Sequence, residues 1–453
     1  MTTSNPVADK DESPRLQKIE IEGLFETDNV SLEFTDAATT ILYGTNGAGK
    51  STVLRIINHI LSEDDHLLSQ EPFKSATVTL SKNEQIFVNN KKSEITEAIG
   101  GKQGKPIPYK NMADSLKADS LNKFSVYMRR HGLTQARDGT YRDPSDKPVE
   151  QSKLNELKRK FQFFVYQQNE VSSDLRKITL PTNLIKSDRL SPIEIRSLES
   201  RSRPLEMMSP QLRHAIAGES QPIVQNICAK IKNEISEARE ISRQKSSELD
   251  AAFLTKFLKE SEMPDISAEK RAGMKNDLQR LHERLTACSL ATASVADVPN
   301  ELSNKHQKLL DIYLEDLLAK ASATKNQLDK LELFLSILNN KLVDKTAKLS
   351  AVDGLEITRK ENLVPLDKLS SGEQHLIVLF YNLIFKTTSG GVCLIDEPEI
   401  SLNVSWQTQF ITDIIDVARV SPQQYIIATH SPQIVSTHAE LLRSIEVINN
   451  NAP

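Results

Sequence analysis

The run Gly44-Thr45-Asn46-Gly47-Ala48-Gly49-Lys50-Ser51 has the spacing GxxxxGK[ST] of a phosphate-binding loop. Its flanks supply the context that this spacing requires. The apolar, β-branched residues Thr39 to Tyr43 predict a buried strand before the loop, and apolar residues at helical spacing predict a helix after it, from Val53 to Leu61. A strand, a glycine-rich loop and a helix in this order predict a P-loop protein of the α/β class.

The chemistry of such a loop explains how it binds phosphate. Its backbone N–H groups and the N-terminus of the following helix face the phosphates. Lys50 is expected to neutralise the β- and γ-phosphate oxygens, and Ser51 is expected to offer its hydroxyl to Mg²⁺. The predicted nucleotide contacts of the loop are Gly44, Thr45, Asn46, Gly47, Ala48, Gly49, Lys50, Ser51 and Thr52.

Three segments near the C-terminus also suit phosphate chemistry. The apolar run Val392 to Ile395 leads into Asp396, which can hold Mg²⁺, and Glu397, which can orient or deprotonate an attacking water. Leu369-Ser370-Ser371-Gly372-Glu373-Gln374 opens a helix, and helix N-termini bind anions. Tyr425 to His430 predicts another buried strand, whose final histidine can hydrogen-bond a γ-phosphate. Each segment alone also fits a structural role, but their joint order favours a nucleotide site.

The composition limits the class of protein to which this chain can belong. The chain has 453 residues, 38% hydrophobic and 26% charged, which predicts a globular protein of two or three units rather than a disordered one. No apolar run approaches the ~20 residues that span a bilayer, so no membrane contact is predicted. The cysteines Cys228, Cys288 and Cys393 lie far apart, which argues against disulfides and zinc and predicts a reducing, cytoplasmic location.

The middle of the chain is poor in glycine, and this favours long helices. From Leu314 to Leu349, apolar residues recur at alternating intervals of three and four, which predicts one long heptad helix with Lys345 on its apolar stripe. Residues 224–241 also carry apolar side chains at helical spacing. Two long helices with a short helix between them predict an antiparallel hairpin arm. An ordinary helical domain is the alternative.

The motif order resembles that of ABC-type ATPases of the SMC/RecF/OLD branch. Residues 44–51 match the Walker A motif, 369–374 the signature and 392–397 Walker B, with Ser401-Leu402-Asn403 at the D-loop position and His430 at the switch position. The resemblance implies a P-loop ABC ATPase head, a mixed sheet flanked by helices, with the arm inserted into it. The signature departs from the family pattern, because Ser371 replaces its first glycine and Ser370 inherits the phosphate contact.

The resemblance also implies the reaction and its residues. It implies ATP hydrolysis with Mg²⁺ and a homo-oligomer in which two heads enclose two ATP molecules. Phe163 to Gln168 resembles a Q-loop, although which glutamine contacts Mg²⁺ stays open and a plain loop amide fits equally well. Ser187-Asp188-Arg189-Leu190 resembles a segment of OLD-like ATPases, with a structural role favoured for Arg189. The implied catalytic residues are Glu397, His430 and Lys50, the contacts to the opposite head's ATP are Ser370, Gly372 and Glu373, and the metal ligands are Ser51, Asp396 and Gln168.

A separate effector is a further implication of the resemblance. The chain ends shortly after His430, where OLD-type nucleases continue into a Toprim domain, so we expect the nuclease to be another protein. ATPase subunits of PARIS- and Septu-like anti-phage systems are similar, which implies a nucleotide-dependent switch or scaffold in defence. The alternative is an SMC/RecF-like genome-maintenance ATPase that binds DNA directly. A transporter ATPase is disfavoured by the heptad helix.

DNA contact would come from residues 102–160, where 14 Lys or Arg outnumber 7 Asp or Glu. This segment fits a solvated surface or an acidic protein partner equally well. The expected divisions of the chain are a disordered lead-in (1–14), the N-terminal half of the head (15–100), a basic insertion (101–160), a head strand with the Q-loop-like region (161–220), the arm (221–352) and the C-terminal half of the head (353–453).

Overall fold

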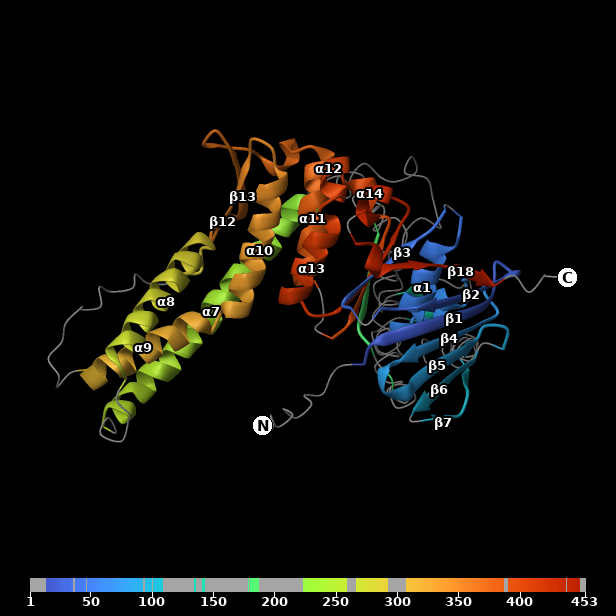
Figure 1. Cartoon of the computed structure of the whole chain (residues 1–453), viewed down its shortest axis with the longest axis horizontal. Coiled ribbons are helices and arrows are strands. Elements are labelled where there is room, and N and C mark those ends of the chain that lie inside the picture. The colour runs from blue at the N-terminus through green and yellow to red at the C-terminus, as the bar shows by residue number, and fades with distance from the viewer. Residues whose placement is uncertain are drawn as a thin grey trace, which may run out of the picture.

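Two large sheets with flanking helices, and a helical arm that projects to one side, make up most of the described fold (Figure 1). The predicted α/β class is confirmed, with parallel and antiparallel strands and helices against them. Residues 161–168 and 187–190 lie outside the described residues, as do the lead-in up to residue 13 and most of the basic insertion. The computed structural model describes residues 14–35, 37–45, 47–92, 94–99, 101–108, 134–135, 141–142, 178, 180–186, 223–258, 266–291, 307–386, 390–436 and 438–448.

A parallel sheet lies between two helical layers. Its strands are β3 (Thr39–Tyr43), β11 (Thr182–Lys186), β15 (Val392–Asp396), β16 (Gln424–Thr429) and β17 (Leu442–Ser444), and its helices are α1 (Lys50–Leu61), α11 (Ser371–Phe385) and α13 (Phe410–Val420). The strand order is β11-β15-β16-β3-β17. Successive side chains point to opposite faces, so Leu394 packs in the cluster of α1 while Cys393 and Ile395 pack in the cluster of α11 and α13. Burial on both faces explains the continuous apolar runs of these strands.

An antiparallel sheet covers the other side of α1. It contains β1 (Leu16–Leu24), β2 (Asp28–Glu33), β4 (Ser75–Leu80), β5 (Glu84–Asn89), β6 (Glu94–Ile99), β7 (Lys102–Gln103), β8 (Ile107–Pro108) and β18 (Glu446–Ile448), in the order β18-β2-β1-β4-β5-β6-β7 with β8 on β6. Strands β1 and β2 pair antiparallel, and β4 and β5 form a hairpin over residues 75–89. Lys82 and Asn83 form its turn with positive φ. Strands β9 (Thr134–Gln135) and β10 (Tyr141–Arg142) form a separate two-stranded sheet, and the short helix α2 (Asp65–Leu68) packs against α1.

The described part of the arm contains four helices. They are α7 (Ile223–Leu258), α8 (Ala268–Ala287), α9 (Gln307–Ser322) and α10 (Lys325–Lys341). Helices α7, α8 and α9 pack together and extend away from the sheets, at the lower left of Figure 1. Charged pairs join the arm helices, with Lys320 of α9 on Asp250 of α7 at 2.6 Å and Arg284 of α8 on Asp329 of α10 at 2.7 Å. Helix α7 packs against the later helices α9 and α10, but the described residues form four helices where the sequence predicts two long helices with a short one between them.

The prediction of one continuous heptad helix from Leu314 to Leu349 is wrong. The helix breaks at Thr324, between α9 and α10, and ends at Lys341. Asp344 has a left-handed backbone with φ 55°, which turns the chain out of the helix. Leu349 then lies in a strand. Alternate side chains of this strand are buried, and this alternation happens to continue the apolar spacing of the helix.

A small sheet joins the arm to the head. It contains β12 (Thr346–Ser350), β13 (Gly354–Arg359) and β14 (Asn362–Leu363), in that order. Gly354 has φ 81°, and a Cβ there would lie 2.1 Å from the carbonyl oxygen of Cys228 in α7. Only glycine therefore permits this contact between α7 and β13.

Among the helices that the structure describes, none is long and apolar enough to cross a membrane.

Candidate nucleotide site

The glycine-rich loop connects β3 to α1 as predicted. Gly49 caps α1 with φ 81°, and a Cβ there would lie 3.0 Å from Leu24 Cδ2 in the neighbouring sheet. A side chain at this position would therefore be strained and crowded. Asn46, one of the expected nucleotide contacts, lies outside the described residues. The remaining loop residues surround the N-terminus of α1, where backbone N–H groups favour an anion.

Lys50 lies within this loop rather than in solvent. Its side chain is buried, and Nζ donates hydrogen bonds to the carbonyl oxygens of Gly44, at 2.7 Å, and Thr45, at 3.0 Å. The ammonium group is thus held by backbone carbonyl oxygens of the loop itself. Phosphate oxygens entering the loop would meet a cation already in place.

Ser51 and Asp396 connect the two halves of the site. The Ser51 hydroxyl donates to Asp396 Oδ1 at 2.8 Å, between residues 345 positions apart in the chain. Burial raises the pKa of the Asp396 carboxyl, while the Ser51 hydrogen bond and the charges of Lys186 and Arg55 oppose that rise. A hydroxyl and a carboxylate side by side are suitable ligands for Mg²⁺, which takes few protein ligands and completes its shell with water and phosphate oxygens. The donor set therefore fits the expected metal.

Glu397 follows Asp396 at the end of β15, in a left-handed conformation with φ 50°. Its backbone N–H donates to the carbonyl oxygen of Ala428 at 2.9 Å, which holds the turn against β16. His430 follows β16, and its Nδ1 lies 3.9 Å from Glu397 Oε1. The structure thus brings the predicted base and the predicted switch histidine to the same edge of the sheet.

Glu399 is the residue at this edge that the sequence analysis missed. It lies in the 3₁₀ turn η7 (Pro398–Ser401), and its Oε1 is 2.9 Å from His430 Nδ1. The same oxygen accepts a hydrogen bond from the His430 backbone N–H at 2.8 Å. A signal was available, because Asp396-Glu397-Pro398-Glu399 places a third carboxylate directly after the strand end.

The signature segment forms the N-terminus of α11. Ser370 and Glu373 make a capping box, in which the Ser370 hydroxyl accepts from Glu373 N–H while the Glu373 side chain accepts from Ser370 N–H. Lys345 donates to the other Glu373 oxygen at 2.6 Å. Gly372 leaves ordinary room, since a Cβ there would lie 3.8 Å from Trp406. In this structure Glu373 acts as a helix cap and ion-pair partner rather than as a ligand group.

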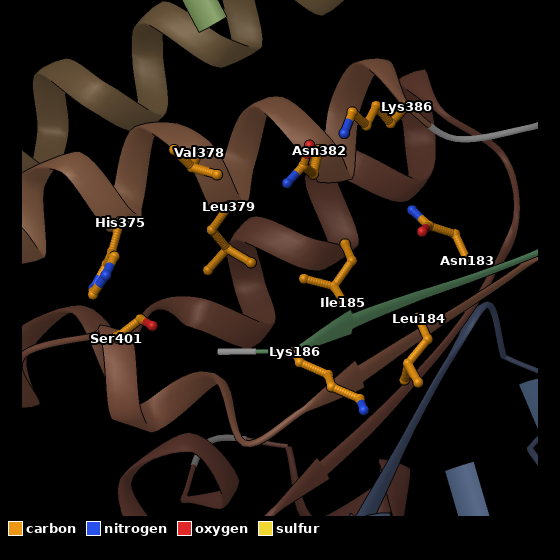
Figure 2. A pocket seen from close by; sticks show the side chains of 10 residues that line it. All are labelled: Asn183, Leu184, Ile185, Lys186, His375, Val378, Leu379, Asn382, Lys386 and Ser401. Atoms are coloured by element: carbon orange, nitrogen blue, oxygen red, sulfur yellow. The ribbon is translucent and has the colours of Figure 1, made fainter. Parts of the chain in front are cut away.

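The strand beside Walker B is β11, with Lys186 opposite Asp396 in the parallel register. The expected Q-loop strand at Phe163 to Gln168 lies outside the described residues, and so does the segment containing Arg189. A cavity of about 70 Å³ lies between β11 and α11 and is lined by Lys186, His375 and Asn382 among others (Figure 2). Burial lowers the pKa of His375, so this cavity is lined by a histidine that favours its neutral form.

Comparison with known proteins identifies the family. Residues 15–435 match the family profile described as "AAA ATPase domain". The chain belongs to this family. As an ATPase domain it is a nucleotide-binding protein, which agrees with the Walker A geometry. No curated protein matches the chain significantly.

Among the solved structures similar to this ATPase domain are SMC head domains. One, from Pyrococcus furiosus, has an extended coiled coil and is bound to the C-terminal domain of ScpA; it is 12% identical, with 96% of each chain covered and a TM-score of 0.34. The SMC head domain from Thermotoga maritima is 14% identical, with 96% of each chain covered and a TM-score of 0.32. Likenesses this low add nothing to the assignment of function.

The capping box generates a prediction about pH. Burial raises the pKa of Glu373, but the hydrogen bonds from Lys345 and Ser370 outweigh burial, so the pKa lies below its ordinary value. A depressed pKa contributes stability above the unfolded pKa of about 4.3, and that contribution is lost as the pH falls through the folded pKa. Wild type should therefore lose more stability than Glu373→Gln between pH 6 and acidic pH, measured as urea midpoints. The exposed Glu315→Gln should follow wild type, and equal acid losses in all three proteins would contradict the assignment.

Proposed function

We propose that this chain hydrolyses ATP in a Mg²⁺-dependent reaction, as an ABC-type ATPase. The observation that carries the proposal is the hydrogen bond between Ser51 and Asp396, with Glu397 and His430 at the same edge of the sheet. Parallel strands end together at this edge, which is where α/β proteins bind their ligands. Nothing else in the described residues combines a phosphate loop, a hydroxyl–carboxylate pair and a strand-end base.

The proposed roles follow from these positions. Lys50 would bind the phosphates within the loop, and Ser51 with Asp396 would hold Mg²⁺, which neutralises phosphate charge when bound. Glu397 would orient the attacking water and accept its proton. His430 would hydrogen-bond the γ-phosphate. The proposal of Gln168 as a further metal ligand rests on the resemblance of residues 163–168 to a Q-loop.

Two subunits are proposed to share each ATP. Ser370 lies at the N-terminus of α11, which packs on the opposite face of the parallel sheet from α1. A helix N-terminus placed there is suited to a nucleotide held by a second head. Ser370, Gly372 and Glu373 would then approach the opposite γ-phosphate, and Glu373 would exchange its capping contacts for that role.

The arm is proposed to respond to head engagement. Lys345, at the base of the arm, pairs with Glu373 at 2.6 Å. Lys341, almost fully buried at the end of α10, pairs with Asp413 of α13 at 2.6 Å. These contacts join the end of the arm to the helices beside the signature, so a displacement of α11 would be transmitted to α10 through charged pairs rather than through a loose linker.

We place this switch in bacterial anti-phage defence, where it would hold and control a separate effector such as a Toprim nuclease. The support is the resemblance of the motif order to PARIS- and Septu-like ATPase subunits, together with the arm. The second candidate is an SMC/RecF-like genome-maintenance ATPase, which the excess of positive charge in residues 102–160 favours.

Two variants separate binding from hydrolysis. Lys50→Ala removes the cation of the loop, so ATP affinity should fall at least about tenfold, a loss of about 1.4 kcal/mol. Glu397→Gln keeps the binding residues but removes the base, so ATP should bind normally while kcat falls about 100-fold or more. Isothermal titration with ATP and phosphate release measure the two effects. Turnover by Glu397→Gln at the wild-type rate would refute the assignment of the base.

Head engagement is tested by Ser370→Arg. Arginine at the N-terminus of α11 should block ATP-dependent dimerisation, measured by light scattering in the Glu397→Gln background, because its bulk and positive charge oppose the approach of a second head. ATP binding to the monomer should be unchanged. Ser322→Arg, at an exposed position on the arm, is the matched control and should dimerise normally. Loss of ATP affinity in isolated Ser370→Arg monomers would count against a shared site.

The effector is tested by co-purification. We expect the tagged chain to purify with the product of a neighbouring gene and to release or activate it when ATP is added. The pure chain should cleave neither DNA nor RNA. Nuclease activity of the pure chain would contradict the separate effector, whereas stable binding to DNA alone would favour the genome-maintenance alternative.

A further inference from the structure

Glu399 is buried beside His430 although the catalytic scheme above assigns it no role. Its side chain is only 7% exposed, and a single oxygen, Oε1, lies within hydrogen-bond distance of both the backbone N–H and the ring Nδ1 of His430. The backbone hydrogen bond and the short contact with the ring place one carboxylate oxygen against both the main chain and the side chain of His430. A buried carboxylate is costly, so its retention at this edge needs a reason.

The carboxylate of Glu399 favours one tautomer of the His430 ring. A carboxylate oxygen accepts hydrogen bonds, so the tautomer that suits the 2.9 Å contact with Glu399 is the one with the proton on Nδ1. Nε2 is then the nitrogen left for a ligand, and it makes no hydrogen bond to any described residue. The His430 side chain is 40% exposed, in contrast to its partner Glu399. One nitrogen therefore faces the protein and the other is available to the nucleotide.

Glu397 does not share this task. Its Oε1 lies 3.9 Å from His430 Nδ1, beyond hydrogen-bond distance, whereas Glu399 lies at 2.9 Å. The two carboxylates therefore have different roles. Glu399 contacts the histidine, and Glu397 orients the attacking water.

A second connection holds the Glu399 turn in place. Gln407 Nε2 donates to the carbonyl oxygen of Glu399 at 3.3 Å and to that of Leu402 at 2.9 Å. Gln407 Oε1 accepts from the hydroxyl of Ser431 at 2.7 Å, directly after His430. The turn that carries Glu399 and the segment that carries His430 are thus linked by two independent paths, which favours a preorganised arrangement over an adaptable one.

We propose that Glu399 is the positioning residue for His430, fixing the tautomer and orientation that present Nε2 to the γ-phosphate. The proposal rests on the ATPase function proposed above. The reach of the Glu399 side chain to Nδ1 and to the backbone N–H of His430 matters more for this role than its negative charge.

Isosteric and shortened variants test the reach. Glu399→Gln keeps an oxygen at the same position and should retain most of kcat. Glu399→Asp keeps the charge but is one methylene shorter. Both Glu399→Asp and Glu399→Ala should lower kcat by about 10- to 100-fold, the size of loss found when outer partners of functional histidines are altered. KM for ATP should stay close to wild type, because the loop and Lys50 still bind the nucleotide. Thermal unfolding of each variant checks the fold.

A double variant tests whether Glu399 acts through His430. Glu399→Ala should cost nothing further in the His430→Ala background, since residues that act as one unit are non-additive. The matched control is Glu440→Ala. Glu440 pairs with His438 Nδ1 at 3.2 Å at an exposed position, and its removal should leave kcat unchanged.

The outcomes are distinct. Additive losses in the double variant, or a Glu399→Asp protein that is as active as Glu399→Gln, would overturn the positioning role. Wild-type kcat in Glu399→Ala would overturn it as well while leaving the ATPase function intact. Absence of hydrolysis by wild type itself would instead refute the ATPase function.

Discussion

The hydrogen bond between Ser51 and Asp396 is the contact on which the site depends, because it brings together residues 345 positions apart. It forms only if the glycine loop begins α1 at Lys50 and if β15 ends at Asp396 in the same layer. Both conditions follow from the parallel sheet, in which β16 separates β15 from β3. An error of one residue in the register of β15 would turn Asp396 to the opposite face and remove the pair.

The order of strands explains why residues distant in sequence meet at one edge. Parallel strands end at the same side of a sheet, and here β3, β15 and β16 end in the loop, the carboxylate pair and His430. Their interiors are fully buried, so each strand is rigid and its final residue is well positioned. Polar groups follow directly after apolar runs, and that abrupt change places charge at the end of a dry, ordered core.

The arm depends on a different kind of contact. Its helices pack around buried leucines, but its attachment to the head uses charges, with Lys341 on Asp413 and Lys345 on Glu373. A charged pair in a buried setting is directional and costly to break singly. This makes the junction specific, and it connects the arm to the same capping box that shapes the signature segment.

The sequence by itself determined the P-loop, the strands beside it, the carboxylate pair and His430, because each depends on local spacing and on apolar runs whose period is visible in one dimension. It also indicated the helical arm. The tertiary structure alone decided where the predicted heptad helix breaks, at Thr324 and Asp344. The apolar spacing continues past these positions into strand β12, so the spacing alone does not mark the breaks. It alone placed β11 beside Walker B and Glu399 against His430. Such pairings join segments far apart in the chain, and their partners are selected by packing and burial in three dimensions, which local spacing does not encode.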